Sequence, residues 1–210
     1  MSISRIDPNL ANLGVKEKDV VWFSAHDNVF SLHGIFYEEE TGLYTRVPHK
    51  IAKSVSTGVE TLAYRCSGGR LRFVSDSPYV AIKASLPAFM PMPHMAMTGS
   101  HGFSVYADGV FAQKYVPPFE TFLNGVDYGS PLTSRIQFAE SRTIFKEKDR
   151  HEALYEIYFP LYGGVAELYI GVKEGSVMKP APEYKYKKPI LFYGSSITQG
   201  ACVSRPGNDF

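Results

Sequence analysis

The sequence lacks a charge excess of either sign, and this balance excludes two classes of protein. The 210 residues include 22 Lys and Arg against 21 Asp and Glu, which gives a formal net charge of +1. Binding to nucleic acid or to an acidic membrane through charge needs a strong positive excess. We therefore expect neither nucleic acid nor a membrane among the partners.

Cysteine and long apolar runs are also scarce. The two cysteines, Cys66 and Cys202, are too few for a disulfide framework, and neither belongs to a Cys-x-x-Cys pair of the kind that binds metal. No run approaches the ~20 apolar residues of a membrane-spanning helix, and the first residues contain no signal-peptide core. These absences predict two free thiols and a cytoplasmic location.

Aromatic residues and helix breakers, in contrast, are abundant. The chain contains 14 Phe, 14 Tyr, 18 Gly and 14 Pro. Gly and Pro interrupt helices, whereas aromatic residues favour strands. This composition disfavours a helical bundle and favours a β-rich fold.

Short segments in which apolar and polar residues alternate follow turn signals through the first 172 residues. Two of these segments flank Asp108-Gly109, the dipeptide best suited to a type I′ hairpin, and two others flank Gly163-Gly164. Many short strands joined by hairpin turns predict a mainly β fold, an antiparallel, jelly-roll-like β-sandwich. The predicted strands are Leu71–Ser75, Tyr79–Ser85, Phe103–Tyr106, Val110–Val116, Tyr155–Tyr162 and Val165–Val172.

The composition changes after Val172. Residues 173–189 are rich in Pro and Lys and have no periodic face, as is typical of a linker. Ile190–Tyr193 is continuously apolar, which is typical of a parallel strand buried on both faces. We therefore predict a sandwich domain at residues 1–175, a linker at 176–189, and the start of a truncated α/β domain at 190–210.

The segment after the linker carries the chemistry. Its sequence from Ile190 onward, Ile-Leu-Phe-Tyr-Gly-Ser-Ser-Ile-Thr-Gln-Gly-Ala-Cys-Val-Ser-Arg-Pro-Gly, resembles the first conserved block of SGNH (GDSL-type) hydrolases. It most closely resembles the subgroup with an N-terminal β-sandwich ahead of the catalytic domain. The resemblance implies a serine ester hydrolase (lipase or esterase) in which Ser196 is the nucleophile and its backbone N–H is one oxyanion donor.

The residues around this serine suit that role. A serine on a sharp turn after a buried strand projects its hydroxyl, and glycines let a substrate approach the backbone. By the resemblance, Gly194, Ser195, Thr198 and Gly200 form the active-site loop. Ser195 stands where the general family pattern has aspartate.

A second resemblance lies upstream, at Gly102-Phe-Ser-Val-Tyr106. This segment resembles the Gly-x-Asp-Leu-Tyr motif in the sandwich domain of the same subgroup. Ser104 and Val105 replace the motif's Asp and Leu, so a role tied to that aspartate does not carry over.

The general base of a serine hydrolase is missing. Acyl hydrolysis by serine needs a base and usually a carboxylate to orient it, and the resemblance places both in a late Asp-x-x-His block. None of the six histidines has an aspartate three residues earlier, and none follows Ser196. We therefore expect the chain to be the N-terminal portion of a longer hydrolase and to be inactive alone. The expected substrate is a small acyl ester or an acetylated carbohydrate, with no cofactor.

Methionine and histidine gather between residues 90 and 101. Thioether and imidazole ligands would suit Cu(I), but prolines at 87, 91 and 93 favour an irregular loop, and flexible methionines often line binding surfaces. We expect no metal, and we interpret Met92, His94 and Met95 as a loop that shapes the substrate pocket.

Two further expectations concern binding. The aromatic residues could form a platform for sugar rings, so the alternative function is a non-catalytic carbohydrate-binding or interaction sandwich, although most aromatic positions alternate as core residues do. An apolar strand at Ile190–Tyr193 would have open edges that seek a partner. It should lie against its own sandwich or pair with a second copy in a homo-oligomer.

Overall fold

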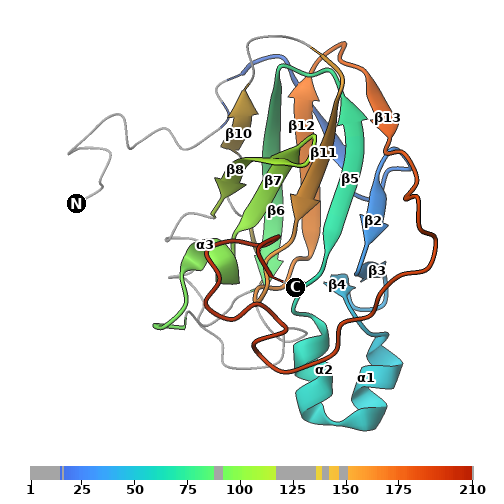
Figure 1. The fold of residues 1–210 in the computed structure, drawn as a ribbon, viewed down its shortest axis with the longest axis vertical. Helices are drawn as coiled ribbons and strands as arrows, with labels where there is room; N and C mark the ends of the chain where they lie inside the picture. The colour runs from blue at the N-terminus through green and yellow to red at the C-terminus, as the bar shows by residue number, and fades with distance from the viewer. Residues whose placement is uncertain are drawn as a thin grey trace.

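Two antiparallel sheets face each other in the computed structural model, which describes residues 15, 17–87, 92–116, 136–138, 142–146 and 151–209. The strands of both sheets run along the long axis of the molecule (Figure 1). The prediction of a mainly β, antiparallel sandwich is confirmed. Within the described residues, no helix is long and apolar enough to cross a membrane.

Sheet A has the order β1-β12-β6-β10, with β9 also paired to β6. Its strands are β1 (Val20–Ser24), β6 (Tyr79–Pro87), β9 (Ile136–Phe138), β10 (Arg142–Lys146) and β12 (Glu167–Lys173).

Sheet B has the order β13-β5-β11-β7-β8, with β2 also paired to β5. Its strands are β2 (Ser31–His33), β5 (Arg70–Ser75), β7 (Phe103–Ala107), β8 (Val110–Tyr115), β11 (Ala153–Tyr158) and β13 (Met178–Pro180).

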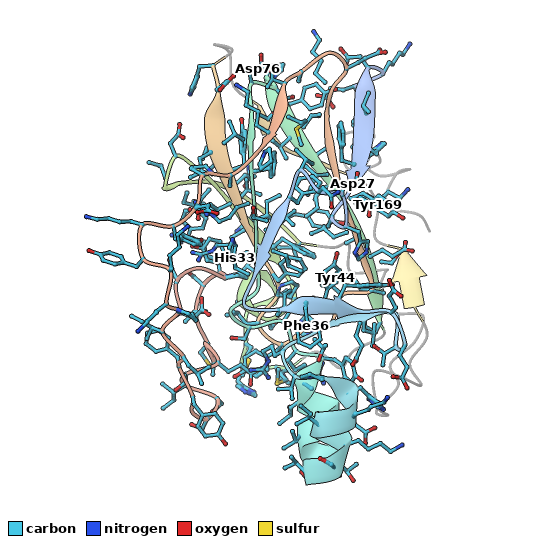
Figure 2. The ribbon with its side chains drawn as sticks, turned by 90° about the vertical axis from the view of Figure 1, so that its right-hand side faces the viewer. Asp27, His33, Phe36, Tyr44, Asp76 and Tyr169 are labelled. Atoms are coloured by element: carbon cyan, nitrogen blue, oxygen red, sulfur yellow. The ribbon has the colours of Figure 1, made fainter. Side chains whose placement is uncertain are left out.

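A small hairpin and two helices close one end of the sandwich. The hairpin joins β3 (Phe36–Glu38) to β4 (Leu43–Thr45), and α1 (His49–Val55) and α2 (Thr57–Ala63) follow it. Phe36 and Tyr44 mark this hairpin in Figure 2, just above the helices. The third helix, α3 (Met97–Ser100), is a single turn just before β7.

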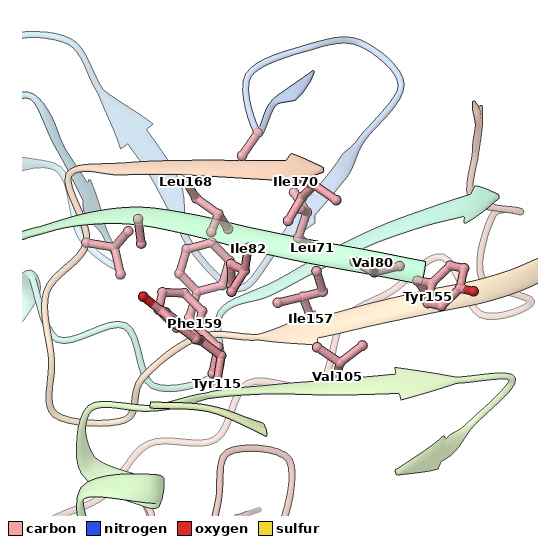
Figure 3. Packing of buried hydrophobic residues seen from close by; sticks show 14 of the residues in the cluster. Leu71, Val80, Ile82, Val105, Tyr115, Tyr155, Ile157, Phe159, Leu168 and Ile170 are labelled. Atoms are coloured by element: carbon pink, nitrogen blue, oxygen red, sulfur yellow. The ribbon is translucent and has the colours of Figure 1, made fainter. Parts of the chain in front are cut away.

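The core lies between the two sheets, because alternate side chains of each strand point inward. Leu71 of β5 faces Ile82 of β6 and Ile170 of β12 across this space, where all three are fully buried (Figure 3). Aromatic rings fill much of it, and the fully buried ones are Tyr44, Phe73, Phe103, Tyr115, Tyr155 and Phe159.

The Asp108-Gly109 turn is confirmed as a hairpin between β7 and β8. Asp108 has a φ of 49° and Gly109 a φ of 77°, and two positive values are the mark of a type I′ turn. The Gly163-Gly164 turn is different, because β11 belongs to sheet B and β12 to sheet A.

The chain therefore crosses between the sheets at residues 159–166, which we call the crossing. A side chain on Gly164 would place its Cβ 2.8 Å from Pro87 Cγ, and one on Gly163 would place it 3.1 Å from His101 Cδ2. Because these glycines have no side chains, the backbone of the crossing can pass close to Pro87 and His101.

The first part of the predicted linker is an edge strand. β13 pairs with β5. The carbonyl of Pro182, two residues after the end of β13, accepts a hydrogen bond from Arg72 Nη1 over 3.1 Å. The Arg72 guanidinium also lies 4.0 Å from the centre of the Tyr184 ring. The linker thus begins as part of the sandwich, while the division of the chain into domains stays a prediction.

The strand predicted at Ile190–Tyr193 is not formed. These four side chains are 80%, 88%, 60% and 96% exposed, and none of the described strands pairs with them. A strand needs hydrogen bonds from a neighbour, so apolar character alone does not make one. The segment that does lie against the sandwich is residues 196–209, described below.

The two thiols should differ in reactivity. Cys66 is buried, Cys202 is exposed, and both are free. Burial raises the pKa of Cys66 to about 12, and a thiol reacts as its thiolate. We expect Ellman's reagent at pH 8 to titrate one thiol in the native chain and two in denaturant. Cys202→Ser should abolish the native reaction, and rapid labelling of Cys66 in that variant would contradict the prediction.

A matched pair of phenylalanines tests the core. Phe159 is fully buried between Tyr44 and Phe103, with ring centres 5.2 and 5.7 Å away. Phe159→Ala should lower the free energy of unfolding by about 3–5 kcal/mol. Phe192→Ala, at a ring that is 60% exposed, should change it by less than about 0.5 kcal/mol. Urea denaturation measures both, and equal losses would show that the core is misplaced.

Candidate active site

Ser196 lies in a tight turn held by its own backbone. The N–H of Gln199 donates to the carbonyl of Ser195 over 3.1 Å, and the N–H of Ala201 donates to the carbonyl of Ser196 over 2.9 Å. The Ser196 residue is exposed. The turn therefore presents this serine to solvent from a fixed backbone.

Glycines make the turn possible at both ends. A Cβ on Gly194 would lie 2.1 Å from Thr198 Oγ1. Gly200 has a φ of +91°, and a Cβ there would lie 2.7 Å from Leu161 Cδ1. The structure thus brings together in one turn all the residues predicted for the loop. We call it the serine loop, and its predicted members are Gly194, Ser195, Ser196, Thr198 and Gly200.

The sandwich holds the serine loop by three hydrogen bonds. The hydroxyl of Tyr162 donates to the carbonyl of Ser196 over 3.0 Å. The side-chain amide of Gln199 donates to the carbonyl of Leu161 over 2.9 Å, and the hydroxyl of Ser67 donates to the carbonyl of Gln199 over 2.9 Å. Two of the three contacts come from the crossing.

The segment after the serine loop packs against α3, as Figure 1 shows in red beside green. Thr98 Oγ1 donates to the carbonyl of Ser204 over 2.6 Å. A Cβ on Gly99 would lie 2.3 Å from the carbonyl oxygen of Val203, so the two backbones touch directly.

The predicted substrate loop lies beside this segment. The thiol of Cys202 donates to the carbonyl of His94 over 3.5 Å. His94 is exposed, while Met92 and Met95 are half-buried. The structure thus places Met92, His94 and Met95 next to the residues that follow the serine loop, and their contact with substrate stays a prediction. Met90 lies outside the described residues.

The Gly102–Tyr106 motif contacts the last described residues. Tyr106 in β7 accepts a hydrogen bond from Arg205 Nε over 3.3 Å and donates to the carbonyl of Gly207 over 3.5 Å. The Arg205 guanidinium also lies 4.2 Å from the centre of the Phe111 ring. The motif's tyrosine therefore helps to hold the segment that carries the serine loop, while Ser104 is buried within the sandwich.

Among the residues that the structure describes, the titratable groups near the site do not form a triad with Ser196. His101 is 3% exposed, and burial, with a smaller effect of Arg65, lowers its pKa to about 2. This imidazole is neutral at physiological pH. Among the described residues, the Ser196 hydroxyl makes no hydrogen bond, and no group of three His, Cys, Asp or Glu side chains could hold a metal ion.

A family model described as GxDLY, the N-terminus of SGNH-hydrolase-type esterases, matches residues 20–178. The chain belongs to this family. The match covers both sheets and the crossing, and it ends at the start of β13. The resemblance to SGNH hydrolases with an N-terminal sandwich is confirmed. No curated protein matches the chain.

Solved structures similar to this chain include a lipase, an acyltransferase and a carbohydrate esterase. A GDSL-like lipase from Bacteroides ovatus ATCC 8483 superposes with a TM-score of 0.68 and 25% identity over 90% of this chain and 50% of that chain. The salicylyl-acyltransferase SsfX3 from a tetracycline biosynthetic pathway superposes with a TM-score of 0.51 and 18% identity, over 81% of this chain and 44% of that chain. A family two carbohydrate esterase from Cellvibrio japonicus has a TM-score of 0.48 and 14% identity over 86% of this chain and 41% of that chain. The chain spans about half the length of the GDSL-like lipase structure.

Three residues that hold the serine loop were not predicted from sequence: Ser67, Leu161 and Tyr162. The only signal for Leu161 and Tyr162 is the Pro160-Leu-Tyr-Gly-Gly164 sequence, which reads as the end of a strand and a turn, and the only signal for Ser67 is the Ser67-Gly-Gly69 turn sequence. They act through contacts that span 34 to 132 residues of sequence, and no local pattern encodes such contacts.

The direct backbone contact at α3 can be tested with one substitution. Gly99→Ala would push a methyl group into the Val203 carbonyl, so the segment from 199 to 209 should separate from α3. We expect hydrogen exchange of its amides to accelerate at least about tenfold, since local opening exposes them.

The control is Gly58→Ala. A Cβ at this position in α2 meets only Ser56 Oγ, at 3.8 Å, and alanine is the better helix former. Exchange in the 199–209 segment should not change in this variant. Unaltered exchange in Gly99→Ala would mean that the two backbones do not touch in solution.

Proposed function

We propose that the chain supplies the nucleophile of a serine ester hydrolase, and that this nucleophile is Ser196. The observation that carries the proposal is the serine loop itself: an exposed serine on a fixed turn, attached to the N-terminal domain of the SGNH-esterase family. Attack by a serine hydroxyl on an acyl carbonyl needs this combination of access and fixed direction.

The reaction would proceed in two steps. The Ser196 Oγ attacks the carbonyl carbon of the ester while its proton passes to a general base, and the alcohol leaves as that proton is returned to it. Water then hydrolyses the acyl-enzyme by the same route. The Ser196 N–H makes no backbone hydrogen bond within the described residues, which supports its role as one oxyanion donor.

The base and its carboxylate would come from outside these 210 residues. None of the described histidines contacts the Ser196 hydroxyl, and His101 is neutral and buried. The half-length coverage of the GDSL-like lipase structure supports a catalytic domain of which this chain contributes the first block. Alone, the chain would be inactive.

The substrate would be a small acyl ester or an acetylated carbohydrate. The substrate loop at Met92, His94 and Met95 lies beside Cys202, six residues after the nucleophile, which supports a role in shaping the pocket. The sandwich would then contribute both to substrate binding and to support of the serine loop.

Substitution of the nucleophile tests this function. In the intact enzyme, which includes the general base, Ser196→Ala should lower kcat for p-nitrophenyl acetate by at least about a thousandfold, because loss of a nucleophile removes the covalent route. Ser54→Ala, at an exposed serine of α1, is the matched control and should have no effect.

Two results would contradict the proposal. One is an active Ser196→Ala enzyme. The other, turnover by the 210-residue chain alone that is lost in its Ser196→Ala variant, would contradict only the proposal that the base lies outside these residues, because the chain would then hold its own base.

A further inference from the structure

We infer that Tyr162 is a positioning residue for the nucleophile, so that the sandwich fixes the direction of the Ser196 side chain through one hydroxyl. The inference rests on the proposed function and deepens it. Tyr162 lies in the crossing, 34 residues before the serine in sequence, and its hydroxyl donates to the Ser196 carbonyl over 3.0 Å.

The argument begins with the two peptide planes on either side of the Ser196 Cα. The plane before it contains the carbonyl of Ser195, which accepts from the Gln199 N–H. The plane after it contains the carbonyl of Ser196, which accepts from the Ala201 N–H and from the Tyr162 hydroxyl. Fixing both planes fixes φ and ψ of Ser196, and these set the direction of its Cα–Cβ bond. Only rotation about χ1 is then left to the hydroxyl.

Both planes are tied to the sandwich, not only to the turn. The Gln199 side chain donates to the Leu161 carbonyl, and the Gln199 carbonyl accepts from Ser67. The second plane is tied by Tyr162 directly. A short turn by itself would be a weak support, since even a short helical segment is marginal in water.

Tyr162 is in turn held on its other side. Its N–H donates to the Ser100 carbonyl over 2.8 Å, and its carbonyl accepts from Arg65 Nη1 over 2.7 Å. Burial raises the pKa of the Tyr162 hydroxyl, which keeps it protonated, and so a donor, through the neutral range. The hydroxyl therefore projects from a backbone that cannot easily move away from the serine loop.

The consequence is kinetic. A serine whose backbone is fixed spends more time in the attacking orientation, and this lowers the barrier without changing ground-state binding of the substrate. Loss of the Tyr162 hydroxyl should therefore lower kcat and leave KM nearly unchanged. A residue that only stabilised the fold would not lower kcat while leaving KM nearly unchanged.

The experiment uses Tyr162→Phe, which removes the hydroxyl and keeps the ring. In the intact enzyme, kcat for p-nitrophenyl acetate should fall about three- to tenfold, the effect of one hydrogen bond, with KM within about twofold. In the 210-residue chain, hydrogen exchange at the Ala201 amide should accelerate by a similar factor. Tyr186→Phe, at a tyrosine that is 77% exposed, is the matched control and should change neither quantity.

A second variant tests the other plane. Gln199→Glu replaces the amide donor by a carboxylate facing the Leu161 carbonyl, so kcat should fall again with little change in KM. This variant leaves Tyr162 intact, so it tests the support of the first plane by the sandwich independently of Tyr162→Phe.

The outcomes separate the two proposals. If Ser196→Ala inactivates the enzyme but Tyr162→Phe leaves both kcat and Ala201 exchange unchanged, the inference is wrong and the proposed function stands. If the Ser196→Ala enzyme stays active, the proposed function fails, and with it the catalytic role of Tyr162. A fall in kcat matched by an equal rise in KM would indicate substrate binding instead and would also overturn the inference.

Discussion

The crossing between the two sheets is the constraint on which both the core and the site depend. The chain leaves sheet B after Tyr158 and enters sheet A at Glu167, and between them Phe159, Leu161 and Val165 are fully buried or nearly so. Burial of these side chains fixes the backbone of the crossing, since each contributes ~1.5–3 kcal/mol when removed from water.

The same backbone then presents its polar groups to the C-terminal segment. Leu161 offers its carbonyl to Gln199, and Tyr162 offers its hydroxyl to Ser196. Gly200 faces Leu161 so closely that a methyl group would not fit. Apolar packing on one side of a single short segment thus determines the position of the candidate nucleophile on the other.

Alternation of apolar and polar residues predicted the longer strands of both sheets. The strands β5, β6, β7, β8, β11 and β12 all follow from it, as does the type I′ turn at Asp108-Gly109. Strands of three residues such as β2 and β13 are too short to show an alternation of apolar and polar residues. They are recognised only in the structure, by their pairing with β5.

The predictions from sequence were wrong where the structure of a segment depends on residues that are distant in sequence. Gly163-Gly164 reads as a hairpin turn, but the space around Pro87 and His101, not strand pairing, requires these glycines. Ile190–Tyr193 reads as a buried strand, but no described strand lies beside it. Within the site, the serine loop is local and was predictable, whereas its support by Ser67 and Tyr162 is tertiary and was not.

The contact of Gly99 with the Val203 carbonyl limits how this sandwich can be exchanged in evolution or in protein engineering. Two backbones in direct contact leave no side chains between them that could adapt to a new partner. A chimera that joined a foreign sandwich to residues 194–209 would also need the α3 glycine and the Leu161–Tyr162 pair in matching positions. The two parts should therefore be inherited as a unit. Recombination within the exposed residues 185–193 should be tolerated only when both parent proteins share this contact.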